Sequence, residues 1–130
     1  MLEIARFLLP GAPERVAPFS HAVRAGDFLF VTGQMPTRPG GGHRMVEGGI
    51  EAQTRQVIGN LQAVLAGCGA SWERTVFARV YLTQFERDYA AMNAIWEASF
   101  PPDGLPGRTC VGVAALAVGA LVEIDLVAAL

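Results

Sequence analysis

The chain has 130 residues, of which 52% are hydrophobic and 17% charged, with a formal net charge of -2. This length is usual for one domain that buries its own core, so we expect a single domain over residues 1–130. The slightly acidic charge disfavours nucleic acid as the main partner, because phosphate binding calls for a basic patch. All ten basic residues are arginine, which excludes a lysine Schiff base, a pyridoxal phosphate anchor and a phosphate-loop lysine.

Neither a metal site nor a membrane segment is expected. Cys68 and Cys110 are far apart in sequence, and with only two histidines the chain offers no credible zinc site. Glu3 and Pro10 interrupt what would be the apolar run of a signal peptide. No segment reaches membrane-spanning length without breaks. We therefore expect a cytoplasmic protein.

The N-terminal third is expected to hold two strands and a long loop. Residues 1–18 are poorly patterned and carry three prolines. Residues 20–24 and 27–34 are predicted strands, since the second is rich in aromatic and β-branched residues. Residues 37–49 form a loop with a run of glycines at its centre.

The rest of the chain alternates helices and strands. The apolar spacing predicts amphipathic helices over residues 50–66 and 86–100. Strands are predicted over 74–83, 108–115 and 120–129, the last two joined by a short turn. The order β-β-α-β-α-β-β indicates an α+β fold with one mixed sheet and both helices on one of its faces.

The predicted faces of these elements can be stated residue by residue. The side chains expected on one face of the strand 74–83 are Val76, Ala78, Val80 and Leu82. Those expected to point inward from the second helix are Tyr89, Met92, Ile95, Trp96 and Phe100. The last strand leaves a second face with Leu121 and Val127 beside Glu123 and Asp125. Because so apolar a face is a liability in a monomer, we expect it to be covered by packing between subunits.

Arg108 is the most informative single residue. Residues 109–130 contain no other basic residue and only two charges, Glu123 and Asp125. A guanidinium in such an apolar stretch needs an anionic partner or several hydrogen bonds, and its planar donors match a carboxylate. Arg108 is therefore either the anchor of a bound anion or half of a structural ion pair, and its position between a loop and a strand favours the anion.

The other candidate residues each have a plainer interpretation. Glu123 is either a catalytic acid or a solvated strand residue, and it gains weight if a hairpin brings its strand beside that of Arg108. Cys110 suits a pocket wall better than a nucleophile, because no histidine lies near it. Gly33 would let backbone approach a ligand, although an ordinary strand end is the better explanation of Thr32 and Gly33 from the pattern alone.

Several segments, taken together, resemble the Rid family, also called the YjgF-like proteins, over nearly everything from Phe19 to the C-terminus. The matching segments are Pro18–Val23, Asp27–Gln34, Ile50–Val57, Val80–Thr83, Gly107–Val111 and Leu121–Ile124. Asn93 falls where the second helix of the family carries asparagine, although in this chain it would serve equally well as a solvent-facing residue. Each segment is weak alone, and the combination is specific.

The resemblance implies a chorismate-mutase-like fold and a homotrimer with active sites between subunits. It implies cofactor-independent hydrolysis of enamines and imines, such as 2-aminoacrylate or 2-iminobutanoate, to 2-keto acids and ammonia. Arg108 matches the residue that holds the substrate carboxylate, and Glu123 matches the acid that helps to position water. The substrate-binding positions that the resemblance implies are Phe19, Thr32, Gly33, Asn93 and Cys110.

Three departures from the family pattern bear on substrate preference. Phe19 stands where many members have tyrosine, Thr32 where serine is commoner, and Gly107 where alanine is commoner. Three other functions stay open: a non-catalytic trimer that binds small carboxylates, a deaminase dedicated to one pathway and acting on an aminomuconate-like acid, and a ribonuclease or translation inhibitor. The acidic balance disfavours the last of these.

Overall fold

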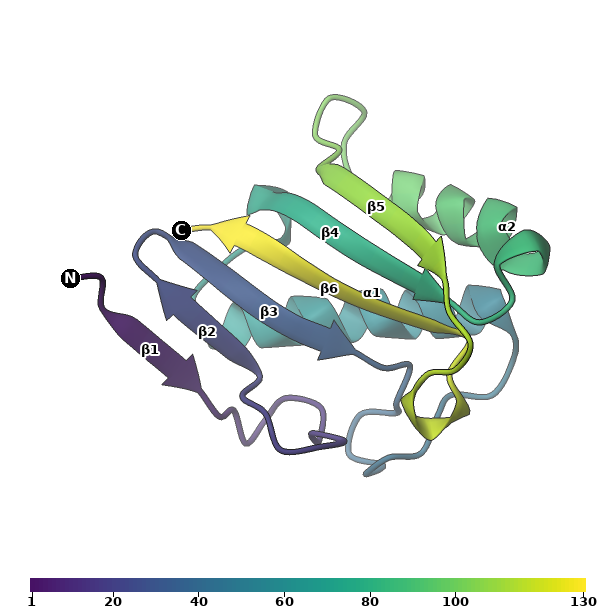
Figure 1. Cartoon of the computed structure of the whole chain (residues 1–130), viewed down its shortest axis with the longest axis horizontal. Coiled ribbons are helices and arrows are strands. Elements are labelled where there is room, and N and C mark those ends of the chain that lie inside the picture. The colour runs from purple at the N-terminus through teal and green to yellow at the C-terminus, as the bar shows by residue number, and fades with distance from the viewer.

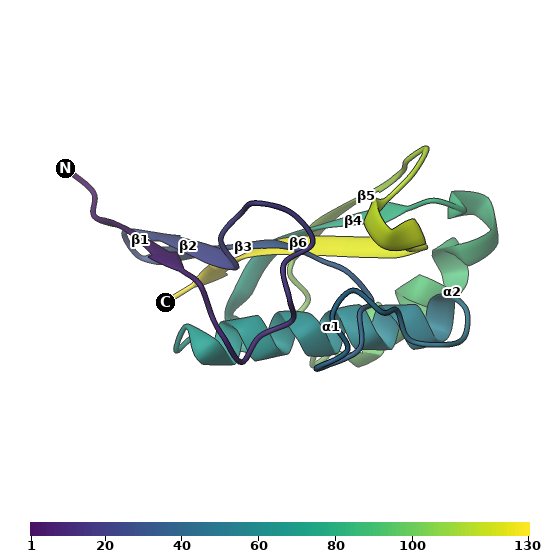
Figure 2. The same cartoon turned by 90° about the horizontal axis from the view of Figure 1, so that it is seen from below.

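The computed structural model describes all 130 residues. The strands are β1 (Ile4–Phe7), β2 (Ala22–Ala25), β3 (Phe28–Gln34), β4 (Thr75–Leu82), β5 (Gly107–Gly112) and β6 (Val122–Ala129), and the helices are α1 (Ile50–Gly67) and α2 (Phe85–Ala98). All six strands form one sheet in the order β1-β2-β3-β6-β4-β5 (Figure 1). Both helices lie against the same face of that sheet (Figure 2). The predicted α+β fold is confirmed.

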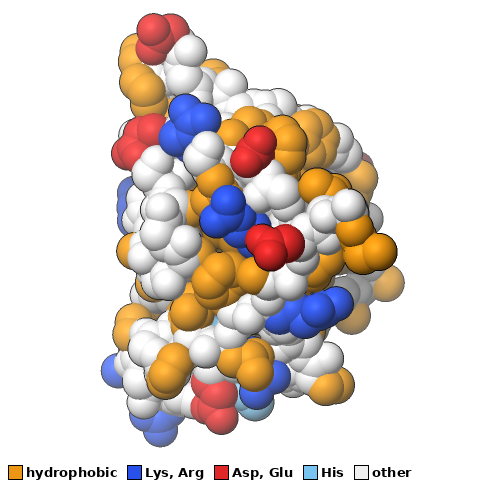
Figure 3. All heavy atoms as spheres, turned by 90° about the vertical axis from the view of Figure 1, so that its left-hand side faces the viewer, with side chains coloured by type: hydrophobic (Ala, Val, Ile, Leu, Met, Phe, Trp, Pro, Cys, Tyr) orange, Lys and Arg blue, Asp and Glu red, His pale blue; other side chains and the backbone are white.

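One strand, β1, escapes prediction within the poorly patterned residues 1–18. It pairs antiparallel with β2, with Ile4 opposite Ala25 and Phe7 opposite Ala22. Only Phe7 packs against the core, so this short edge strand lacks the alternation by which strands are recognised. The side of the molecule that carries β1 mixes hydrophobic side chains with separate basic and acidic ones, without an extended basic patch (Figure 3).

The core lies between the helices and the covered face of the sheet. The stripe predicted for α1 is confirmed, with Val57, Leu61 and Val64 fully buried. Along β6, alternate residues from Val122 to Ala128 are buried, as expected for a sheet covered on one side. Neither helix has the length and the hydrophobicity that crossing a membrane requires.

Two predicted core residues are exposed instead. Val76 is 43% exposed, because the register between β4 and β6 shifts between Thr75 and Phe77. Such a bulge adds one residue to the strand and breaks the strict alternation. Tyr89 is 38% exposed and stacks on Phe85 at 4.6 Å between ring centroids, so it covers the start of α2 rather than filling the core.

The predicted hairpin between the last two strands is wrong. β5 runs parallel to β4, and β4 lies between β5 and β6. The unit β4-α2-β5 is a crossover in which the helix returns the chain to the same end of the sheet, as parallel strands require. The nine residues from 113 to 121 then pass β4 and insert β6 at the centre of the sheet.

The other face of the sheet has no helix on it, and we call it the open face. It presents Phe28 and Phe30 of β3 and Phe77 of β4, each between 41% and 48% exposed. A hollow of about 590 Å³ lies among Phe30, Phe77, Arg79 and Asp125. The predicted apolar character of this face is confirmed, together with the two acidic residues of β6 that interrupt it.

Candidate functional site

Arg108 points towards α2 and is held there by neutral groups. Its register partner on β4 is Ala78, which is fully buried beneath the helices. One terminal nitrogen donates to Asn93 Oδ1 at 2.7 Å and the other lies 3.7 Å from the sulfur of Met92. The guanidinium carbon is 5.8 Å from the ring centroid of Trp96, a cation–π distance. These contacts orient the guanidinium and leave its charge in place.

No carboxylate neutralises Arg108 within the chain. The three ion pairs of the structure join Arg55 to Glu51, Arg79 to Asp125 and Arg87 to Asp88. The interpretation of Arg108 as half of an ion pair inside the chain is therefore wrong. The guanidinium lines a hollow of about 460 Å³ together with Asn93, Trp96, Leu105 and others. With five N–H donors and few partners, it has donors left for an anion.

Cys110 lies two residues further along β5, on the same side of the sheet as Arg108. It is half-buried and packs against the core. Burial raises the pKa of its thiol, and the charge of Arg108 only partly opposes this. A thiol with a raised pKa is a poor nucleophile at neutral pH, so the geometry favours the pocket-wall interpretation over a catalytic one.

Glu123 lies on the open face, and its carboxylate rests against Gly33. A methyl group added at Gly33 would sit 2.1 Å from Oε2 of Glu123, a separation that no side chain can occupy. Burial, and next the charge of Asp125, raise the pKa of Glu123. Gly33, which has no side chain, thus leaves room for the carboxylate of Glu123. The raised pKa of that carboxyl suits proton transfer near neutral pH.

A small polar network lies beside Glu123 on the open face. Asp125 accepts hydrogen bonds from Arg79 Nε at 2.8 Å and from the hydroxyl of Tyr81 at 3.1 Å. Tyr81 is also the register partner of Glu123 across β4 and β6. Burial, and next the charge of Asp125, raise the pKa of Tyr81. The network holds Asp125 in place while leaving Glu123 without an ion-pair partner.

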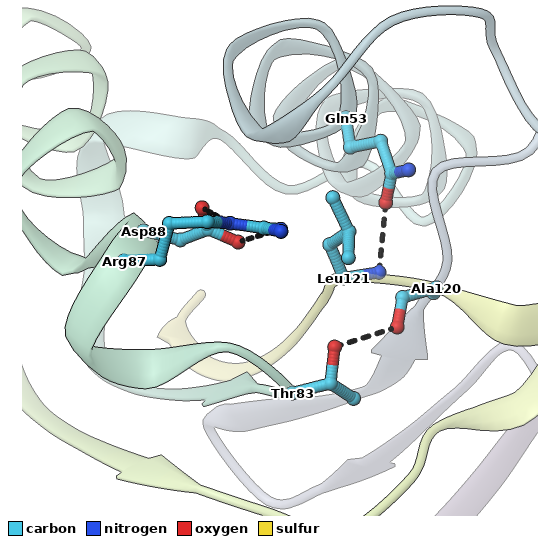
Figure 4. Close-up of polar contacts among 6 residues, drawn as sticks. All are labelled: Gln53, Thr83, Arg87, Asp88, Ala120 and Leu121. Atoms are coloured by element: carbon cyan, nitrogen blue, oxygen red, sulfur yellow. Dashed lines mark hydrogen bonds and ion pairs between the residues drawn. The ribbon is translucent and has the colours of Figure 1, made fainter.

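The start of β6 is tied to two other elements, which fixes the position of Glu123. The amide of Leu121 donates to Gln53 Oε1 of α1 at 2.8 Å, and the hydroxyl of Thr83 donates to the carbonyl of Ala120 at 3.3 Å (Figure 4). The amide of Thr83 also donates to the carbonyl of Leu121. Because Gln53 is 5% exposed, its hydrogen bond is shielded from water and difficult to replace.

Thr32 and Phe19 lie in the region of Gly33. The hydroxyl of Thr32 donates to the carbonyl of Ser20 at 2.7 Å, so this hydroxyl is already used in holding the N-terminal segment to β3. Phe19 is half-buried and, with Gly33, lines a very small cavity beneath that segment. Both residues therefore lie close to Gly33, and their role as substrate-binding positions stays a prediction.

Within one chain, the candidate residues form two separate groups. The first group, on the helix side of β5, contains Arg108, Asn93 and Cys110. The second, on and beside the open face, contains Glu123, Gly33, Thr32 and Phe19. Residues opposite one another in a sheet point to the same side, and the β4 partners of Arg108 and Glu123, Ala78 and Tyr81, point to opposite sides. The expected contact of Arg108 with Glu123 on neighbouring strands is wrong.

Sequence reasoning missed several residues that hold these groups. The sequence predicts Trp96 only as a core residue and predicts no site role for Tyr81 or Arg79. His21 is not recognisable from the sequence as a structural residue, yet it is 5% exposed and joins two backbone segments: its Nδ1 accepts from the amide of Leu9 at 3.0 Å, and its Nε2 is 2.7 Å from the carbonyl of Pro13. The i, i+2 spacing of Glu123 and Asp125 is visible in the sequence. The residues that face them lie on other strands and cannot be identified from that spacing.

Comparisons with known proteins agree on the family. A family model described as Endoribonuclease L-PSP matches residues 10–130. A RutC family protein of Synechocystis is 44% identical over 119 residues, which cover 92% of this chain and 91% of that protein. A RutC family protein of Pyrococcus horikoshii is 38% identical over 117 residues, covering 90% of each.

Solved structures give the same result. A Rid-family protein of unknown function from Yersinia pestis has a TM-score of 0.90 at 33% identity, covering 98% of this chain and 100% of that one. RidA from an Antarctic Psychrobacter has a TM-score of 0.89 at 31% identity, covering 97% and 99%. Since the family model spans nearly the whole chain and these relatives exceed 30% identity, the chain belongs to the Rid family, also called the YjgF-like proteins.

Proposed function

We propose that this protein is a cofactor-independent deaminase that hydrolyses 2-enamino and 2-imino acids to 2-keto acids and ammonia. The observation that carries the proposal is Arg108, a guanidinium oriented by Asn93 and Trp96, without an ion-pair partner, at the wall of a hollow. A planar carboxylate is the anion that such a donor set binds with two parallel hydrogen bonds. 2-Aminoacrylate and 2-iminobutanoate are the simplest substrates of this class.

The reaction needs few groups. The enamine tautomerises to the imine, and water adds to the imine carbon, so that a C–O bond forms while the nitrogen gains a proton. The C–N bond then breaks, ammonia leaves, and the carbon keeps its oxygen as a ketone. Glu123 takes one proton from water and gives it to the nitrogen during addition, then passes the hydroxyl proton to the nitrogen as the C–N bond breaks, so it is unchanged after each turnover.

The carboxylate of the substrate, held by Arg108, keeps the reacting carbon in place during these steps. Backbone groups around Cys110 lie on β5, the edge strand of the sheet, and an edge strand keeps outward-facing donors and acceptors free for a ligand. These groups are placed to hold the imine nitrogen.

The two groups of residues require a second chain if they act together. Arg108 and Glu123 leave the sheet on opposite sides, so we propose a homotrimer in which Arg108 of one subunit faces Glu123 of its neighbour. Burial of the open face, with its exposed Phe28, Phe30 and Phe77, would supply the apolar surface that stabilises the assembly.

Mixing two inactive variants tests the shared site. Arg108→Ala and Glu123→Gln are each expected to be inactive, and co-refolding them in equal amounts should restore activity at roughly a quarter of the sites, because each site takes one residue from each of two neighbours. Sedimentation of the parent protein should give the mass of a trimer. Mixed variants that stay inactive while assembling normally would place each site within a single chain.

Release of 2-keto acid from 2-aminoacrylate generated in situ tests the activity itself. The parent protein should accelerate release, and Arg108→Ala should abolish the acceleration. Arg55→Ala, which removes an exposed arginine 3.9 Å from Glu51, serves as the matched control and should behave as the parent. Glu123→Gln separates an enzyme from a passive binder, because it should lose turnover while keeping carboxylate binding.

A further inference from the structure

The surroundings of Arg108 carry information about the substrate beyond its carboxylate. The hollow that Arg108 lines adjoins a second one of about 520 Å³, and the two share Glu97 and Leu105 as lining residues. Together they form a continuous trough that runs from the guanidinium along the C-terminal half of α2. A ligand anchored by its carboxylate on Arg108 would lie with the rest of the molecule against this trough.

The walls of the trough are largely apolar. The first hollow has Trp96, Leu105 and Pro106 beside the guanidinium. The second continues with small and apolar side chains, which are Ala94, Ala98, Phe100 and Pro102. Leu105 is 51% exposed, so about half of its apolar surface is free to contact a ligand. An apolar group of a ligand placed against these residues would remove apolar surface of both the ligand and the protein from water, which favours binding.

The trough also has a firm outer wall. Leu105 belongs to the segment of residues 101–106, which contains three prolines and therefore has few backbone conformations. Within it the amide of Gly104 donates to the carbonyl of Pro101 at 2.9 Å, closing a tight turn. Phe100, directly before the segment, stacks on Trp72 at 4.7 Å between ring centroids. The wall is thus formed before any ligand arrives.

Charge along the trough is distributed unevenly. Arg108 is the only cation that lines it, and it is the one that binds the first carboxylate. Glu97, which lines both hollows, would repel a second carboxylate further along the ligand. A substrate with two acid groups, such as an aminomuconate-like acid, is therefore disfavoured at this site.

From this geometry we infer that the protein acts on 2-imino acids with one carboxylate and a bulky apolar side chain, branched or aromatic, which lies in the trough between α2 and Leu105. The inference rests on the proposed deaminase function and adds its substrate class. It makes Leu105 and Glu97 specificity-determining residues: Leu105 contacts the apolar side chain, and Glu97 rejects an acidic one.

Imines generated in situ from alanine, leucine, phenylalanine and glutamate provide the test. For the parent protein, kcat/KM should be at least about tenfold higher for the leucine- and phenylalanine-derived imines than for the alanine-derived one, and lowest for the glutamate-derived one. Leu105→Ser should reduce the preference for the large side chains about fivefold, and Glu97→Gln should raise turnover of the glutamate-derived imine severalfold. Leu8→Ser, which changes a leucine that is 59% exposed elsewhere, is the matched control and should leave all four rates unchanged.

The outcomes separate this inference from the proposed function. If the alanine-derived imine is hydrolysed as fast as the leucine-derived one, or faster, the deaminase stands and the substrate class is wrong. If no imine is hydrolysed, the proposed deaminase activity is wrong, and ligand binding then tests the role of the trough separately. In that case 4-methyl-2-oxopentanoate should bind at least about tenfold more tightly than pyruvate, and Leu105→Ser should remove the difference. Equal affinity of the two keto acids would overturn the inference.

Discussion

Arg108 and Glu123 are charged residues of the same sheet, and their side chains have different surroundings on its two faces. Arg108 lies under α2 among an amide oxygen, a sulfur and an aromatic ring, all of which tolerate or favour a cation. Glu123 lies on the open face against the backbone of Gly33, and the neighbouring charge that raises its pKa is another carboxylate, Asp125. A contact between the two would neutralise both. Because β4 separates them, each keeps a charge that a substrate can use.

Apart from substitution of Arg108 or Glu123 themselves, the largest expected effect comes from the close approach of Gly33 to Glu123. Gly33→Ala places a methyl group where Oε2 of Glu123 now lies, so the carboxylate must move by an ångström or more. We expect kcat/KM for imine hydrolysis to fall by about 100-fold, with carboxylate binding at Arg108 retained.

The control for this substitution is Gly59→Ala. An added methyl group there meets no atom within 4 Å, and alanine in a helix is more stable than glycine by up to about 1 kcal/mol. Activity should be unchanged and the protein slightly more stable. Full activity in Gly33→Ala would show that the position of Glu123 does not matter for turnover.

Asn93→Asp tests whether Arg108 can bind an anion because its hydrogen-bond partner, Asn93, is neutral. The new carboxylate would pair with the guanidinium at the present hydrogen-bond distance of 2.7 Å and compete with a bound anion. We expect the affinity for 2-keto acids, measured by titration, to fall about 30-fold, against about fivefold for Asn93→Ala. If the two variants bind equally well, neutrality of the partner is irrelevant.

Substitution of His21 should affect the group of residues around Glu123 on the open face and leave the group around Arg108 unchanged. His21→Ala removes both hydrogen bonds that its ring makes to Leu9 and Pro13 and leaves these partly buried backbone groups unpaired, so the free energy of unfolding should fall by about 2 kcal/mol. His43→Ala, which removes one exposed hydrogen bond to Arg15, should cost less than about 0.5 kcal/mol. Denaturant unfolding measures both.

Hydrogen exchange of the backbone amides shows which part of the chain His21→Ala destabilises. Exchange should accelerate from Leu9 to Ser20 in His21→Ala, while the amides of β5 around Arg108 should stay as protected as in the parent. Faster exchange in β5 would mean that the two groups are coupled within the chain, contrary to their separation on the sheet.

The smallest expected effect concerns pH and stability. Burial, and next the charge of Asp125, raise the pKa of Glu123 above its ordinary value of 4.5. A carboxyl with a higher pKa in the folded than in the unfolded chain favours the fold fully below its unfolded pKa, and this contribution is lost as the pH rises through the folded pKa. Between mildly acidic and neutral pH, the parent should therefore lose stability relative to Glu123→Gln, by less than about 1 kcal/mol because the side chain is only partly buried.

Urea unfolding of the two proteins at several pH values measures this difference. Glu51→Gln, which changes an exposed carboxyl on α1, should follow the parent across the same range. Parallel curves for the parent and Glu123→Gln would contradict the raised pKa. For the proposed deaminase activity, the same raised pKa should place the acid limb of the kcat/KM profile above the ordinary range for glutamate.

Much of the fold and some of the candidate site follow from local patterns. The stripe of α1 and the alternation of β6 each depend on a spacing that neighbouring residues alone display. Arg108 was recognisable because it is the last cation before a long apolar stretch. The short edge strand β1 and the bulge at Val76 were not predicted, since an exposed strand has no apolar face to show and a bulge depends on the strand opposite.

The sequence by itself determined the kind of fold, the covered and the open face of β6, and the residue types available for chemistry. Only the tertiary structure decided that β4 lies between β5 and β6, and with it the side of the sheet on which each charge is used. It also decided that Asn93 and Trp96 orient Arg108 and that Gly33 makes room for Glu123. The physical reason is that alternation is a property of one strand, whereas sheet order and side-chain contacts come from pairing between residues far apart in the chain.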